Sequence, residues 1–176
     1  CSLSILHHDE VIYIARSARK RIGSLHRDVG THMPAHCTSM GRVLLAALSD
    51  KELDAFLATA KLESHTRYTI TDSVELRAVI EKVKRSNHCL VDQEFEIDLR
   101  TLAIPIQNAS GRVIAAMNIA ARASETGKKQ MLDEFLPVYE FSERHSLAID
   151  APAARIDAAV RSVSIADIPV VRALWW

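Results

Sequence analysis

At 176 residues the chain is long enough for one globular domain, or for one domain and a tail, that buries about two-thirds of its unfolded surface without disulfides or metals. Lys plus Arg and Asp plus Glu both total 22, so the chain lacks the excess of positive charge that attracts proteins to nucleic acid. We therefore predict that it binds DNA poorly by itself. The three cysteines are an odd number at wide spacing, and no signal peptide or apolar run of membrane-spanning length is visible, which predicts reduced thiols in a soluble, cytoplasmic protein with no membrane partner.

The first third of the chain changes from strand-like to helical spacing. Residues 2–6 and 11–15 are short runs rich in apolar and β-branched side chains, and the polar residues between them predict a β-hairpin. Residues 22–26 are the candidate for a third strand. From Met40 onward, apolar side chains recur at the spacing of one helix face, with Thr38 at the N-cap position.

Two more helices begin at capping signatures. Ser49 with Glu52, and Asp72 with Glu75, have the three-residue spacing of a capping box. Apolar residues recur at helical spacing after each pair. We therefore predict helices that start at these two positions.

The remaining chain returns to strands and then to one helix. The strand-like segments are residues 88–95, 101–107 and 113–121. Residues 131–139 have helical spacing, and Pro137 should kink that helix because it removes a backbone donor. Strands and helices are segregated, which predicts an α+β domain with helices packed against an antiparallel sheet. We place this domain at residues 1–149 and a C-terminal tail at residues 150–176.

The start of the helix at Met40 is suited to an anion. The backbone N–H groups of Ser39, Met40 and Gly41 would point out of the new helix, where the positive end of the helix dipole adds to them. A carboxylate would be held well there. On the residues alone, such a pattern is more often a simple helix cap at Thr38 than an anion site.

Five segments in order resemble the effector-binding half of the isocitrate-lyase-regulator (IclR) family of bacterial transcription factors. They are G-T-H-M-P-A-H-C-T-S-M-G-R-V-L-L-A at 30–46, V-I-Y-I-A-R at 11–16, L-V-D-Q-E-F-E at 90–96, L-R-T-L-A-I-P-I at 99–106 and G-R-V-I-A-A-M-N-I at 111–119. The sequence at 90–106 is most similar to that of regulators of aromatic catabolism and the β-ketoadipate pathway.

The resemblance implies a GAF-like domain that binds a small effector and assembles as a homodimer or homotetramer. It implies no cofactor and no catalysis. Operator DNA would be contacted only through a winged helix-turn-helix, which does not precede Cys1 in this chain. The implied effectors are aromatic acids such as protocatechuate or 4-hydroxybenzoate, or the dicarboxylate β-ketoadipate. The implied effector-binding residues are Gly30, Thr31, Asp92, Thr101, Asn118 and Ala120, and the helix start described above adds Thr38, Ser39 and Met40 to the candidate site.

The resemblance implies specific contacts for five of these residues. Gly30 and Thr31 would offer backbone N–H groups to a carboxylate, and Asp92 would accept from a hydroxyl. Thr101 and Asn118 would hydrogen-bond carboxylate or hydroxyl groups.

The chain departs from the family pattern at two positions. Ala120 stands where some relatives have serine, which favours a bulkier or more apolar effector. Asp98 stands where relatives have glycine, which predicts a positive φ.

Two rival hypotheses remain open at this point. One is a metal-binding or thiol-based sensor that uses His32, His36, Cys37 and Cys89, although no zinc signature has this spacing and loop histidines with buried thiols explain these residues more simply. The other is a catalytic domain, but the chain contains no nucleophile elbow, phosphate-binding loop, dinucleotide fingerprint or zinc-protease helix. We therefore predict that the protein is not an enzyme.

Overall fold

The structure, a computed structural model, describes residues 1–17 and 28–136. All of these residues belong to one compact unit, Cys1–Glu140. The third strand predicted at 22–26, the kink at Pro137 and the tail at 150–176 lie outside the described residues. Within the described ranges, no helix has both the length and the apolar character needed to span a bilayer.

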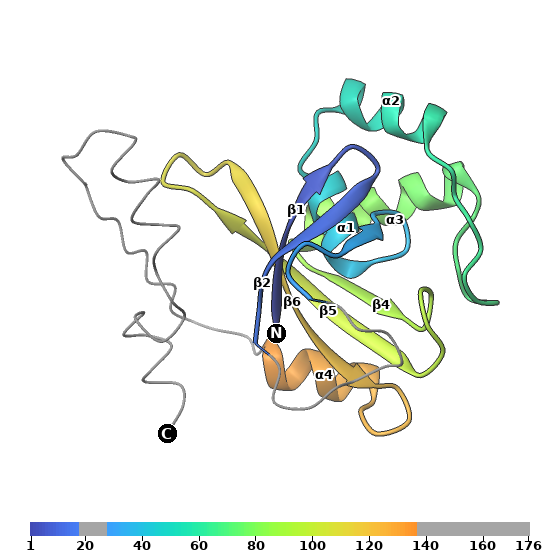
Figure 1. The fold of residues 1–176 in the computed structure, drawn as a ribbon, viewed down its shortest axis with the longest axis vertical. Coiled ribbons are helices and arrows are strands. Elements are labelled where there is room, and N and C mark those ends of the chain that lie inside the picture. Colours follow the sequence, from blue (N-terminus) through green and yellow to red (C-terminus); the bar gives the residue numbers. More distant parts are fainter. Residues whose placement is uncertain (18–27, 137–176) are drawn as a thin grey trace. The chain divides into compact units, whose positions relative to one another are not determined.

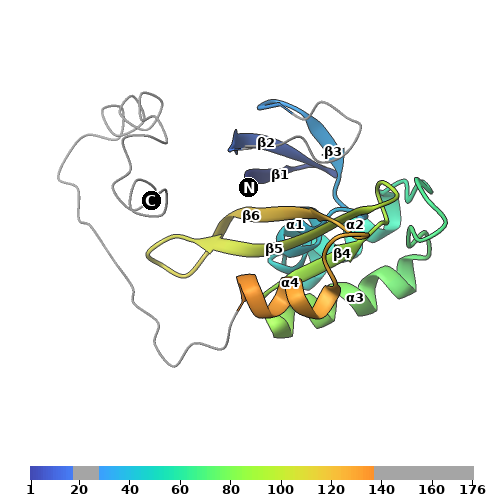
Figure 2. The ribbon, with the colours of Figure 1, turned by 90° about the horizontal axis from the view of Figure 1, so that it is seen from below.

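A six-stranded antiparallel sheet forms the centre of the fold (Figures 1 and 2). In spatial order its strands are β3 (His32–Pro34), β2 (Glu10–Arg16), β1 (Ser2–His7), β6 (Val113–Arg122), β5 (Leu99–Gln107) and β4 (Cys89–Asp92). The predicted α+β class and both predicted hairpins are confirmed.

Two details of the sheet differ from the prediction. β4 ends at Asp92, because Gln93 has a φ of 63° that takes the chain out of the extended conformation. β3 was not predicted, since its three residues with one buried side chain, Met33, are too short to show a periodicity.

The described residues form four helices. They are α1 (Ser39–Ala46), α2 (Asp50–Thr59), α3 (Ser73–Ser86) and α4 (Lys128–Phe135). The predicted caps are confirmed: the Ser49 hydroxyl accepts from the backbone N–H of Glu52 at 3.4 Å, and the Asp72 carboxylate accepts from that of Glu75 at 2.8 Å. In Figure 1, α1 and α3 lie beside the sheet, and α4 lies at the end of β6 opposite the β5–β6 hairpin.

Every residue of α1 is buried, which makes this helix the centre of the core. It packs on the sheet and on α3, whose buried face includes Leu76 and Ile80. The helix approaches the preceding loop so closely at Gly41 that a Cβ there would overlap the carbonyl oxygen of Ala35. Glycine is therefore required at this position by backbone packing.

Candidate effector-binding site

α1 lies along β6, with its N-terminus toward the C-terminal end of that strand. Near the start of the helix, the Met40 sulfur accepts a hydrogen bond from the Ser4 hydroxyl at 3.2 Å, and Ser4 is the cross-strand neighbour of Ala116. At the other end of the helix, a cavity of about 60 Å³ lies between Ala47 and Val113. The start of α1 is therefore directed toward the part of β6 that follows Ala116.

Two rows of cross-strand neighbours lie on this face of the sheet beyond the start of α1. Residues directly paired in antiparallel strands point to the same face, and Ser2 and Asn118 are each two positions from the Ser4–Ala116 pair. The first row contains Arg16, Ser2, Asn118, Ala103 and Cys89. The second row contains Ala120, Thr101 and Val91.

Three hydrogen-bond donors at the start of α1 have no acceptor among the described residues. The Ser39 hydroxyl is buried and unpartnered. The backbone N–H groups of Ser39 and Met40 belong to the first helical turn, where no intrahelical acceptor exists, whereas the Gly41 N–H donates to the Thr38 hydroxyl at 3.3 Å. Because buried donors without partners are costly, and the positive end of the helix dipole lies here, this position is suited to a bound anion.

The facing strands supply polar and apolar groups. The side chains of Thr101 and Asn118 make no hydrogen bond to any described residue, although Asn118 is only 7% exposed. Val91 and Ala103 are buried beside them on the same face, and Ala120 is exposed. This combination of a few polar groups on an apolar wall is typical of a small-molecule site.

Thr38 supports this site through the helix that it caps. Its hydroxyl accepts from Gly41 and donates to the Pro34 carbonyl at 2.9 Å, so its polar capacity is used within the protein. The residue therefore fixes the start of α1, and with it the positions of Ser39 and Met40.

The structure does not leave the backbone N–H groups of Gly30 and Thr31 available to a ligand. The Gly30 N–H donates to the Tyr13 carbonyl at 2.7 Å, and the Thr31 N–H donates to the Asp28 carbonyl at 3.0 Å. Gly30 has a φ of 88°, which glycine tolerates best, so its role here is in the turn before β3. In this conformation, neither backbone N–H group is free to donate to the carboxylate of a ligand, as the prediction required.

Asp92 lies on the opposite face of the sheet from Thr101 and Asn118. It pairs across β4 and β5 with Arg100, the neighbour of Thr101, and its Oδ1 is 2.8 Å from the Arg100 Nη2. Its Oδ2 is 2.9 Å from the Nζ of Lys128, the first residue of α4. Burial raises the pKa of this carboxyl, but the hydrogen bonds from Lys128 and Arg100 outweigh it and lower the pKa.

The residue of β4 that faces the candidate site is therefore Val91. A sequence shows that side chains alternate along a strand, but it does not show which of two adjacent residues faces the core. Asp98, in the turn that follows β4, has a φ of 67°, as its departure from glycine predicted.

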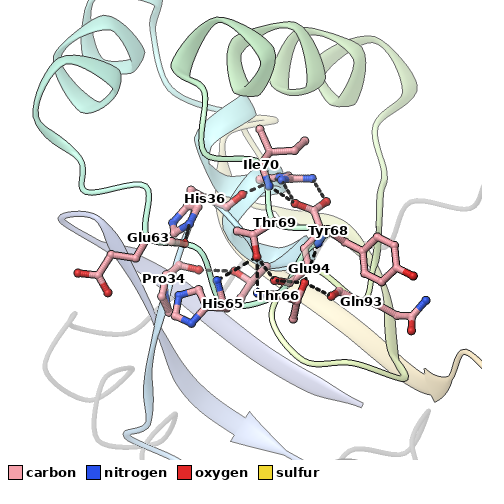
Figure 3. Close-up of polar contacts among 12 residues, drawn as sticks. Pro34, His36, Glu63, His65, Thr66, Tyr68, Thr69, Ile70, Gln93 and Glu94 are labelled. Carbon is pink, nitrogen blue, oxygen red and sulfur yellow. Dashed lines mark hydrogen bonds and ion pairs between the residues drawn. The ribbon is translucent and has the colours of Figure 1, made fainter.

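A buried ion pair between Arg42 and Glu94 holds α1 to the loops beside it, and Figure 3 shows Glu94 with its loop partners Thr69 and Ile70. The Arg42 Nη1 and Nη2 atoms each lie 2.6 Å from a carboxylate oxygen of Glu94, and the Arg42 Nε donates to the His36 carbonyl at 2.7 Å. The Glu94 carboxylate also accepts from the Ile70 N–H at 3.2 Å, and the Thr69 hydroxyl donates to the Glu94 carbonyl at 2.6 Å. All the polar groups of the pair are engaged, so its role is to position α1.

The four residues of the rival sensor hypothesis are not brought together. The His32 Nδ1 is 2.8 Å from the Glu10 carboxylate at the edge of the sheet, whereas Cys89 is buried on β4. Burial raises the pKa of Cys37 and Cys89 to about 12, so both thiols are protonated and lack the thiolate that redox chemistry needs. The described part of the chain therefore gives no support to a sensor built from these four residues.

The structure is an α+β domain in which the start of a buried helix has unpartnered donors near an antiparallel sheet. Residues 1–145 match the family described as bacterial transcriptional regulator IclR C-terminal, and the chain belongs to this family. The family consists of transcriptional regulators rather than enzymes.

The chain is similar to regulators of aromatic catabolism. It is 41% identical over 138 residues to the Pca regulon regulatory protein of Pseudomonas putida, covering 78% of this chain and 47% of the relative. It is 32% identical over 142 residues to the p-hydroxybenzoate hydroxylase transcriptional activator of Acinetobacter baylyi, covering 78% of this chain and 52% of the relative. The chain thus spans about half the length of these curated relatives.

A solved structure has the same GAF-like fold. The inducer-binding domain of an Acinetobacter PobR double mutant, in complex with 3-hydroxybenzoic acid, is 31% identical to this chain with a TM-score of 0.72. The match covers 77% of this chain and 80% of that one. The predicted fold class and family are therefore confirmed.

Proposed function

We propose that this chain is the effector-binding part of a transcriptional regulator and that its effector is a small aromatic acid. The observation that carries the proposal is the set of unpartnered donors on Ser39 and Met40, at a helix start directed toward the strand rows that contain Thr101 and Asn118. Three donors at a helix start match the two oxygens of one carboxylate. A hydroxyl or a second oxygen of the effector would be held by Thr101 and Asn118.

The apolar part of the site favours an aromatic body over a purely polar ligand. Val91, Ala103 and Ala120 present only hydrocarbon to the space beyond α1, and no acidic side chain lies in the same two rows. Protocatechuate and 4-hydroxybenzoate fit this pattern. β-Ketoadipate has a second carboxylate, for which Arg16, in the first row, is the candidate partner.

The response to the effector would be transmitted to a part of the protein beyond this chain. Relatives about twice as long regulate transcription, and we propose that a winged helix-turn-helix makes the operator contact in the cytoplasm. A homodimer or homotetramer would couple the two functions. Such coupling requires the effector to bind the two conformational states with different affinities, typically by about 1–3 kcal/mol.

Thermal unfolding against a panel of aromatic acids, β-ketoadipate and pyruvate tests the proposal. An effector at one hundred times its Kd should stabilise the folded chain by about 2.7 kcal/mol, which is a Tm increase of several degrees. The increase should disappear in Thr101→Val and Asn118→Ala. It should persist in Asp92→Asn, the matched control on the opposite face, with each variant compared to its own ligand-free Tm.

Two outcomes would contradict the proposal. If no acid raises the Tm, the start of α1 is a helix cap only. If an acid raises the Tm and Asp92→Asn abolishes the effect while Asn118→Ala does not, the effector binds the other face of the sheet.

A further inference from the structure

Two histidines and a cysteine converge outside the effector site. One ring nitrogen each of His36 and His65 and the Cys37 sulfur all lie within 4.8 Å of one another. His36 and Cys37 belong to the loop that leads into α1, whereas His65 belongs to the loop between α2 and α3. Their two imidazole rings, whose centroids are 6.0 Å apart, lie near each other in Figure 3.

The distances suit a metal ion after small side-chain movements. Around a tetrahedral zinc ion, with bonds of about 2.1 Å to nitrogen and 2.3 Å to sulfur, ligand atoms lie about 3.5 Å apart. Closing the cluster from within 4.8 Å requires shifts of about 1 Å, and the exposed His65 has room to make them. The set has three protein ligands, which leaves a fourth position for water.

One ring nitrogen of His36 is fixed by a hydrogen bond to the backbone. Its Nε2 lies 3.1 Å from the Glu63 carbonyl oxygen, and a carbonyl can only accept, so this nitrogen carries the proton and Nδ1 keeps its lone pair. Metal-binding histidines usually donate their second ring N–H to such a carbonyl or a carboxylate.

We propose that His36, Cys37 and His65 form a zinc-binding site that joins the loop before α1 to the loop before α3. Zinc prefers this mixture of nitrogen and sulfur ligands. On binding, the Cys37 S–H bond breaks, a sulfur–zinc bond forms, and the proton leaves to solvent with no change of oxidation state. The Arg42–Glu94 pair already joins the same two loops, so the ion would strengthen a connection that positions the start of α1.

Cobalt(II) and zinc titrations of the whole chain test this site. Cobalt should give a thiolate-to-metal charge-transfer band at one equivalent, and that band should be absent in Cys37→Ser. Zinc at one hundred times its Kd should raise the Tm by about 5–10 °C, and this shift should be lost in His65→Ala. Because His65 is exposed, this variant should fold even if Cys37→Ser does not.

The double variant His7→Ala/His32→Ala is the matched control. It removes two exposed histidines whose rings are 6.3 Å apart, so it tests adventitious binding at another histidine pair. The proposal requires this control to keep the charge-transfer band and the Tm shift. It is overturned if the wild-type chain gives no thiolate band, or if His65→Ala retains the full zinc effect. The metal titrations contain no effector, so a failed zinc site and a failed effector site are distinguished by separate measurements.

Discussion

Replacement of Ser39 by alanine should change stability and effector binding in opposite directions. In the ligand-free chain, the Ser39 hydroxyl is buried without a partner among the described residues, and such a group costs about 1–3 kcal/mol of desolvation. Ser39→Ala should therefore leave the free energy of unfolding unchanged or raise it by up to that amount. With an effector bound, the same hydroxyl donates to a carboxylate, a hydrogen bond worth about 1.5–3 kcal/mol. Its loss should weaken binding by about 10- to 150-fold.

Urea unfolding of the ligand-free protein and calorimetric titration with the acid found in the panel measure the two effects. Ser73→Ala is the matched control, since Ser73 is also the first residue of a helix, α3, and the change in helix propensity is the same. This control should bind the effector with wild-type affinity. The reasoning is refuted if Ser39→Ala destabilises the ligand-free chain more than Ser73→Ala does, or if it binds the effector as tightly as the wild type.

Three further predictions concern the groups that hold the site in place. Arg42→Met should lower the free energy of unfolding in urea by about 3–5 kcal/mol, because it leaves the Glu94 carboxylate buried without its cation. The added substitution Glu94→Leu should recover most of this loss. Equal stability of the single and double variants would contradict the prediction. Gly41→Ala should lower stability by about 1–3 kcal/mol or more through backbone overlap, whereas Gly127→Ala, with open space around its Cβ, should show little change in a thermal melt. The pKa of Asp92 is lowered in the folded state, so its ion pairs stabilise the protein fully at pH values above 3.8, the ordinary pKa of the carboxyl. This contribution is lost as the pH falls through the lower pKa of the folded state. Asp92→Asn should therefore reduce stability at pH 7 and flatten the loss of stability below pH 4 in a series of urea titrations.

The local signals in the sequence were sufficient for the helix starts. Thr38, Ser49 and Asp72 all cap helices as predicted, because a cap depends on a side chain and backbone groups within three residues of it. The same locality makes Ser39 and Met40 candidates on the sequence alone. Their first-turn N–H groups lack intrahelical acceptors wherever the helix is placed.

Only the tertiary structure decided which residues share the site with that helix start. The pairing of β4 with β5 places Val91 beside Thr101 and turns Asp92 away, and a shift of one residue in this register would have reversed the two. The Gly30 N–H donates to the carbonyl of Tyr13 on β2, a partner that no local sequence rule identifies. Long-range packing also brings His65 to His36. Caps and periodicities are properties of neighbouring residues, whereas a binding site is made by strands and loops that meet only when the chain folds and α1 packs on the sheet.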